Sequence, residues 1–170
     1  MSHPLLMALF YDVSAAAGVA RDLHLLGLDR SDLSVVARDH STESAIGRQI
    51  DATPGSEIED SSAASRFGEL SGYVLAAIAI GLPGTGAVVA AGPLAAELGE
   101  AAGHAAGGLK SALIKAGLPD QDAERWRTQI ESGEAILLGA HVRTGDATLV
   151  ESAMQRRSSG RVIRTEWNGD

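Results

Sequence analysis

The chain has 170 residues, no cysteine, 14 lysines and arginines against 22 aspartates and glutamates, and an aromatic content of only 4%. A chain of this length can bury enough surface to fold without a disulfide or a metal. The missing cysteines exclude a disulfide scaffold, a Cys-ligated zinc site and a thiol nucleophile. With a net charge of −8, the chain lacks the basic surface that binds nucleic acids and anionic membranes. We therefore expect one domain, or one domain with an appendage, and no nucleic-acid partner.

The amino-terminal part predicts a β-α-β unit. An apolar run of strand length, residues 5–11, is followed directly by Asp12, a residue that caps helices well. Apolar residues then recur every three or four positions up to Leu26, and Gly27 provides a left-handed stop. Residues 33–38 are rich in β-branched side chains and predict a second strand.

The carboxy-terminal third repeats this order of elements. Residues 135–143 predict a strand, Asp146 caps the next helix, and residues 161–167 predict a last strand. A further helix begins near Pro119 and runs to about Gly133. Two β-α-β units predict an α+β fold, a ferredoxin-like split β-α-β sandwich with helices on one face of its antiparallel sheet. Residues 1–38 and 117–170 would form this domain.

The long stretch between strands 2 and 3 has two parts. Residues 39–66 are rich in Ser, Asp, Glu and Gly, which predicts a polar acidic linker. Residues 67–116 are rich in Gly and Ala, with no charged residue between Tyr73 and Ala96. The breaking residues Pro83 and Gly84 divide this part, so we expect a long helical hairpin with arms over residues 69–80 and 93–115.

Small residues recur every four positions along the second arm, which places them on one helical face and lets another helix approach closely. We predict an oligomer interface formed by Ala91, Ala95, Gly99, Gly103 and Gly107, together with Gly68, Gly72 and Ala76 of the first arm. Aliphatic residues form a second stripe. A closed bundle of hairpins would enclose an apolar chamber lined by Leu75, Ile78, Leu94, Leu98, Leu109 and Leu113.

No arrangement typical of catalysis is visible in the sequence. We find neither a nucleophile beside its base nor a pair of carboxylates in an apolar setting, and we predict no enzyme, cofactor or metal. Glu100 and His104 lie four apart on one helical face, which we interpret as a surface ion pair rather than half of a metal site. The arginines between residues 156 and 164 are interpreted as helix-end and exposed strand charges. Trp126 and Trp167 are expected in the core, with interface anchoring as the alternative.

Three segments resemble a known family. Residues 27–37 (Gly-Leu-Asp-Arg-Ser-Asp-Leu-Ser-Val-Val-Ala), 117–123 (Gly-Leu-Pro-Asp-Gln-Asp-Ala) and 133–138 (Gly-Glu-Ala-Ile-Leu-Leu) flank the Gly/Ala-rich segment. In this order they resemble bacterial general stress proteins with a YflT-like domain. The resemblance implies a ferredoxin-like domain interrupted by a glycine-zipper hairpin, with no established catalytic activity and no catalytic residue to transfer.

We expect a non-enzymatic homo-oligomeric scaffold or stress-type protein that assembles through its hairpin. Its partners would be other copies of itself or a larger protein complex, and its chamber would hold a lipid-like molecule such as a quinone. One alternative is a membrane-associated stress protein whose hairpin enters the bilayer, and another is a ferredoxin-like domain that senses a small ligand. The first residues lack the basic start of a secretory signal, so the cytoplasm is the expected compartment, with membrane association as the alternative.

Overall fold

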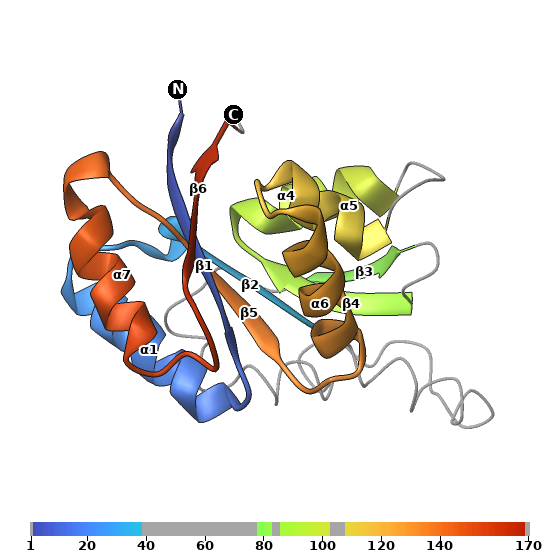
Figure 1. Ribbon diagram of the computed structural model, residues 1–170, viewed down its shortest axis with the longest axis horizontal. Coiled ribbons are helices and arrows are strands. Elements are labelled where there is room, and N and C mark those ends of the chain that lie inside the picture. Colours follow the sequence, from blue (N-terminus) through green and yellow to red (C-terminus); the bar gives the residue numbers. More distant parts are fainter. Residues whose placement is uncertain (1, 39–77, 83–85, 103–107, 169–170) are drawn as a thin grey trace, which may run out of the picture.

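The computed structural model describes residues 2–38, 78–82, 86–102 and 108–168 (Figure 1). The strands are β1 (His3–Phe10), β2 (Leu33–Arg38), β3 (Ile78–Leu82), β4 (Gly86–Ala91), β5 (Ile136–His141) and β6 (Ile163–Trp167). The helices are α1 (Val13–Leu25), α4 (Pro93–Ala102), α5 (Gly108–Lys115), α6 (Asp120–Glu131) and α7 (Ala147–Gln155), with short 3-10 turns at Arg30–Asp32 and Thr144–Asp146.

The strands described here form one antiparallel sheet in the order β3-β4-β2-β5-β1-β6. Each of the two β-α-β segments connects strands that are not neighbours: β1 and β2 lie on either side of β5, and β5 and β6 lie on either side of β1. The two segments are therefore interleaved, which brings the first and last strands together in the register His3↔Trp167. The expectation of an α+β chain with an antiparallel sheet is confirmed.

Local sequence explains the first β-α-β segment. The Asp12 side chain accepts a hydrogen bond from the Ala15 backbone N–H at 2.7 Å and so caps α1. Gly27, with φ of +100°, follows the end of α1 and allows the chain to turn toward β2. Both signals are visible in the sequence, and the helix that they predict is confirmed.

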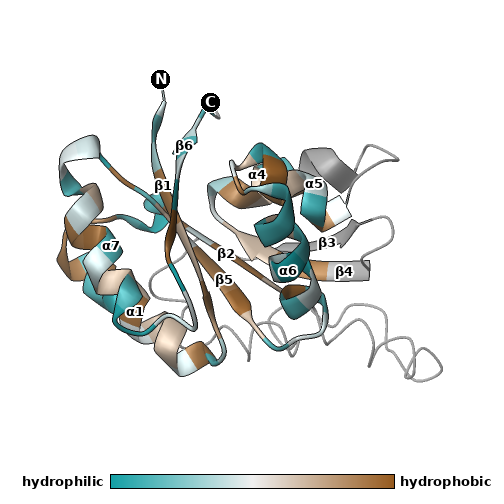
Figure 2. Ribbon diagram, viewed as in Figure 1, coloured by the Kyte–Doolittle hydropathy of each residue, from teal (hydrophilic) through white to brown (hydrophobic). Residues whose placement is uncertain are grey.

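Helices cover both faces of the sheet (Figure 1), whereas the sequence pattern predicts them on one face. The first core lies between the sheet and the pair α1 and α7, and includes Phe10, Leu23 and Leu138. The second core lies between the opposite face and α4, α5 and α6, and includes Leu98, Leu113 and Trp126. Figure 2 shows apolar colours along β2 and β5 and mainly hydrophilic colours along α6. The sheet is therefore the apolar middle layer of three.

The helical hairpin expected over residues 67–116 needs correction where the structure describes it. Ile78–Leu82 and Gly86–Ala91 are strands that pair with each other in the register Ile80↔Val88, in place of the end of a helical arm and its turn. The second arm is helical but consists of two described helices, α4 and α5, rather than one. Most of the first arm lies outside the described residues. Pairing with the sheet through β4 and β2 stabilises this short segment, which is rich in Val, Ile and Ala, more than continuing as a helix would.

Candidate functional site

Of the predicted oligomer interface, the structure describes only Ala91, Ala95 and Gly99. Ala91 lies in β4 and Ala95 in α4, and their exposed fractions are 1% and 8%. Gly99 lies in the following turn of α4. The remaining predicted members, Gly68, Gly72, Ala76, Gly103 and Gly107, lie outside the described residues.

The predicted chamber residues are largely used inside the chain. Leu94 and Leu98 of α4 and Leu109 and Leu113 of α5 are all less than 4% exposed, and they pack in the second core against the sheet. Ile78 begins β3, and Leu75 lies outside the described residues. Because the four leucines already have apolar neighbours within one chain, they do not line an open chamber in this conformation. The helices that carry them fold back onto the sheet instead.

A buried polar chain lies at one end of the second core. Ser34 of β2 has no exposed surface and His141 of β5 is 7% exposed. Ser34 Oγ lies 3.2 Å from His141 Nε2, and His141 Nδ1 lies 3.0 Å from His3 Nε2. The Leu94 backbone N–H at the start of α4 donates to Ser34 Oγ at 3.0 Å. The His141 and Trp167 rings are nearly perpendicular, with ring centroids 5.1 Å apart.

Burial, together with the electrostatic effect of the neighbouring His3, lowers the pKa of His141 to about 4. His141 is therefore neutral near pH 7. In one consistent assignment the Ser34 hydroxyl donates to Nε2, and the Nδ1–H of His141 donates to His3. A serine beside a histidine that is oriented by a third group resembles the nucleophile, base and orienting residue of a catalytic triad. Ser34 has no exposed surface, however, so a substrate cannot reach Oγ in this conformation. The chain acts here as a polar connection between β1, β5, β2 and the start of α4.

A second candidate is a cavity of about 280 Å³ beneath α6. It lies where the end of β1, the middle of α6 and the segment that leads into β6 meet. Its walls combine apolar and polar side chains, contributed by Leu9, Tyr11, Arg125, Trp126, Gln129, Ser159, Gly160, Arg161 and Ile163. The sequence pattern places Arg161 in a basic cluster and Trp126 in the core, but it does not connect them. No local signal could have done so, because the residues come from three separate parts of the chain.

The arginines of the basic cluster do not form one patch. The Arg157 side chain lies against α1, where a Cβ at Gly18 would be 1.9 Å from its Nη1 atom. Arg161 lines the cavity beneath α6. Arg164 is exposed and opposite Leu6 in the β1–β6 register, on the face that α1 and α7 cover. Arg157 and Arg164 therefore lie on the side of the sheet that α1 and α7 cover, whereas Arg161 lines a cavity on the other side.

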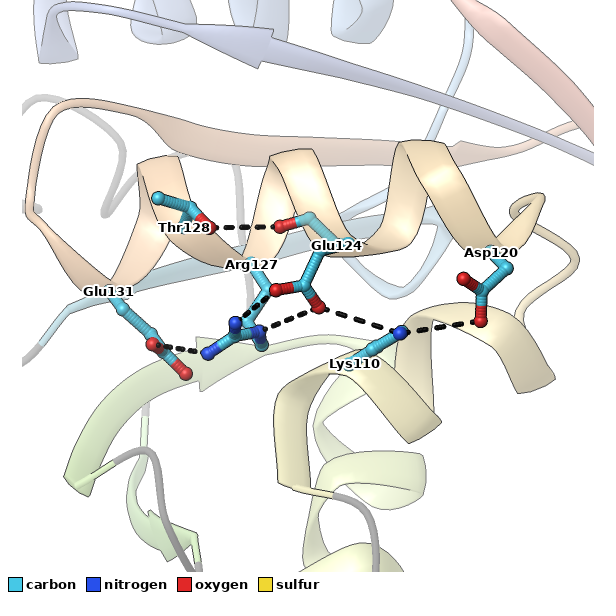
Figure 3. Close-up of polar contacts among 6 residues, drawn as sticks. All are labelled: Lys110, Asp120, Glu124, Arg127, Thr128 and Glu131. Atoms are coloured by element: carbon cyan, nitrogen blue, oxygen red, sulfur yellow. Dashed lines mark hydrogen bonds and ion pairs between the residues drawn. The ribbon is translucent and has the colours of Figure 1, made fainter.

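Figure 3 shows a charged network that joins α5 to α6. Lys110 of α5 lies 3.3 Å from Asp120 and 3.5 Å from Glu124 of α6, and Arg127 pairs with both Glu124 and Glu131. The hydrogen bond from Arg127, aided by the charges of Arg127 and Lys110, lowers the pKa of Glu124. Every acid in the network has a basic neighbour, and the side chains of Asp120 and Glu124 are 74% and 46% exposed. We interpret it as a surface connection between two helices rather than a site for chemistry.

Among the described residues, no group of three or more His, Asp or Glu side chains could hold a metal ion. Glu100 lies in α4, and its predicted partner His104 is outside the described part of the chain. No helix in the described ranges has both the length and the apolar character that crossing a bilayer requires. Comparison with family models, curated proteins and solved structures finds no match to this chain.

Proposed function

We propose that the protein is a non-enzymatic, homo-oligomeric scaffold or stress-type protein that assembles through its Gly/Ala-rich segment. The interleaved strands β1, β2, β5 and β6, with α1 and α7 on one face, support a ferredoxin-like split β-α-β arrangement. The segment between β2 and α6 then adds β3 and β4 to one edge of the sheet and places α4 and α5 on its other face. In this proposal the insertion both completes the chain's own core and provides the contact between copies.

The observation that carries the proposal is the edge strand β3. In the described part of the chain β3 pairs only with β4, and its sequence, Ile78–Leu82, holds no charged residue and no proline. A strand edge presents unpaired N–H and C=O groups that can pair with another chain, and natural proteins usually protect such edges with charges or proline. An edge without these features favours pairing with a second strand.

A second copy of this chain suits that edge better than a different partner. Two β3 strands related by a two-fold axis pair antiparallel, and each then presents the same surface to the other. The chain carries a net charge of −8, which opposes contact between copies over most of its surface. Contact through β3 adds no charged side chain from the strand itself.

The test is to introduce a charge into this edge. We expect the wild-type protein to be a discrete oligomer and Ala79→Lys or Ile80→Lys to weaken self-association by at least about tenfold, because like charges across an interface are costly. Neighbouring strand positions alternate between the two faces, so the variants add the ammonium group on opposite sides. Sedimentation equilibrium gives the association constant, and circular dichroism with thermal unfolding checks the fold of each variant.

Leu149→Lys is the matched control, since Leu149 is a 57% exposed apolar residue on α7 and lies away from β3. It should leave the mass in solution unchanged. A monomeric wild-type protein would overturn the proposal. A stable oligomer that tolerates both edge variants in folded form would overturn the assignment of β3 as its contact.

The apolar chamber for a quinone is not part of this proposal, because its four described leucines already fill the second core. Insertion of the hairpin into a bilayer is not proposed either, since no observation in the described residues favours it.

A further inference from the structure

The cavity beneath α6 combines features that a ligand site needs and that the scaffold proposal does not use. Its floor is apolar: Leu9, Trp126 and Ile163 line the cavity, and each is only 4–8% exposed. Its volume of about 280 Å³ is close to the lower limit for small-molecule pockets and suits a ligand of about one ring. Sites that bind small molecules typically combine such a floor with a few polar groups at the rim.

The charge of the cavity is opposite to that of the whole protein. Arg125 and Arg161 line it, and no acidic residue does, although acids outnumber bases by 22 to 14 in the chain. Arg125 shares its charge with Asp122 through an ion pair. Arg161 has no hydrogen bond or ion pair to any residue that the structure describes. Its planar guanidinium group remains able to bind both oxygens of a carboxylate.

Further hydrogen-bonding groups at the rim are unused within the chain. The Tyr11 hydroxyl, the Gln129 amide and the Ser159 hydroxyl have no partner among the described residues, and each lines the cavity. Both donors and acceptors are present in this set. A flat apolar body over Trp126, with an anionic group directed to Arg161, would satisfy the floor and the rim together.

We propose that this cavity binds a small aromatic carboxylate, with its ring over Trp126 and its carboxylate on Arg161. The carboxylate is favoured over a bare inorganic anion because its ring can cover the apolar side chains of Leu9, Trp126 and Ile163. It is favoured over a neutral ring because both charged residues of the lining are arginines. This inference does not rest on the scaffold proposal, since every lining residue belongs to one chain.

Benzoate is the probe, and NMR of the full chain is the measurement. The protein has only two tryptophans, and Trp167 does not line the cavity, so its indole N–H resonance serves as an internal reference. We expect benzoate to shift the Trp126 resonance in a saturable way, with a Kd of about 1 mM or tighter for so small a ligand. Benzamide, which has the same ring without the charge, should bind at least about tenfold more weakly. Inorganic phosphate should cause no saturable shift at Trp126.

Arg161→Gln should raise the Kd for benzoate by about tenfold, because it removes a charge-assisted bidentate contact. Arg164→Gln is the matched control: Arg164 is exposed and close along the chain, but its position faces the opposite side of the sheet. It should change the Kd by less than about twofold, the loss expected from screened long-range attraction alone. Absence of a saturable shift at Trp126 would overturn the proposal. So would equal weakening by both variants, or equal binding of benzoate and benzamide.

Discussion

Gly92→Ala is expected to lower the free energy of unfolding by more than about 3 kcal/mol. Gly92 joins β4 to α4 with φ of +80°, a conformation that L side chains rarely adopt. A Cβ at this position would also lie 2.0 Å from the carbonyl oxygen of Leu33, a backbone atom of β2 that has little freedom to move. The substitution must therefore displace the start of α4 from the sheet and disturb the Leu94 to Ser34 hydrogen bond.

Two other glycines separate the causes of this effect. Gly27 has φ of +100°, but a Cβ at this position would meet nothing within 4 Å, so Gly27→Ala should cost about 1 to 2 kcal/mol from backbone strain alone. Gly145 has open space around it and is not among the residues with positive φ, so Gly145→Ala should change stability by less than about 0.5 kcal/mol. Chemical denaturation of the three variants measures the series. A Gly92→Ala protein no less stable than Gly27→Ala would contradict the close approach of Gly92 to β2.

Acidification from about pH 6.5 to about pH 4 is expected to destabilise the protein by about 3 kcal/mol through His141 alone. The pKa of His141 is about 4 in the folded chain and 6.5 for an ordinary histidine. Between these values the unfolded chain binds a proton that the folded chain does not, so protons favour unfolding. Stability from this residue is therefore complete above about pH 6.5, and it falls as the pH decreases toward 4.

His141→Gln isolates this contribution, because glutamine has no proton to gain in this range and can still bond to Ser34. Urea unfolding of both proteins across the pH range gives the difference in free energy at each pH. We expect a constant difference above about pH 7, where His141 is neutral, and a change of about 3 kcal/mol in favour of the variant by pH 4. Parallel pH profiles for the two proteins would show that His141 is not buried as a neutral group.

The candidate sites could not be predicted from the sequence because their residues are far apart along the chain. Ser34 and His141 are separated by 107 positions, and His3 and His141 by 138. Each of these residues alone is an ordinary polar residue within or beside an apolar run. Their contact depends on β5 lying between β2 and β1, and strand order is a property of the whole sheet. The same holds for Arg161 and Trp126, which line one cavity only because the fold brings α6 near the segment that leads into β6.

The Gly/Ala-rich segment shows a different limit. A short apolar run without clear periodicity fits a buried helix and a buried strand equally well. The pair Val88 and Val89 favours a strand, but the surrounding alanines favour a helix. The neighbouring strand decides between the two: β4 forms a strand because it can pair with the edge of β2, in the register Val35↔Ala91.

The sequence by itself determined the two β-α-β segments, because their signals act within a few residues: the Asp12 cap, the Gly27 stop and the β-branched runs. Only the tertiary structure decided that Leu94 and Leu113 fill a second core and that Ile78–Leu82 is the edge of the sheet. The physical reason is that hydrophobic burial has no direction of its own. A leucine stripe gains the same free energy against its own sheet as against another copy, and the nearest apolar surface is the one in its own chain.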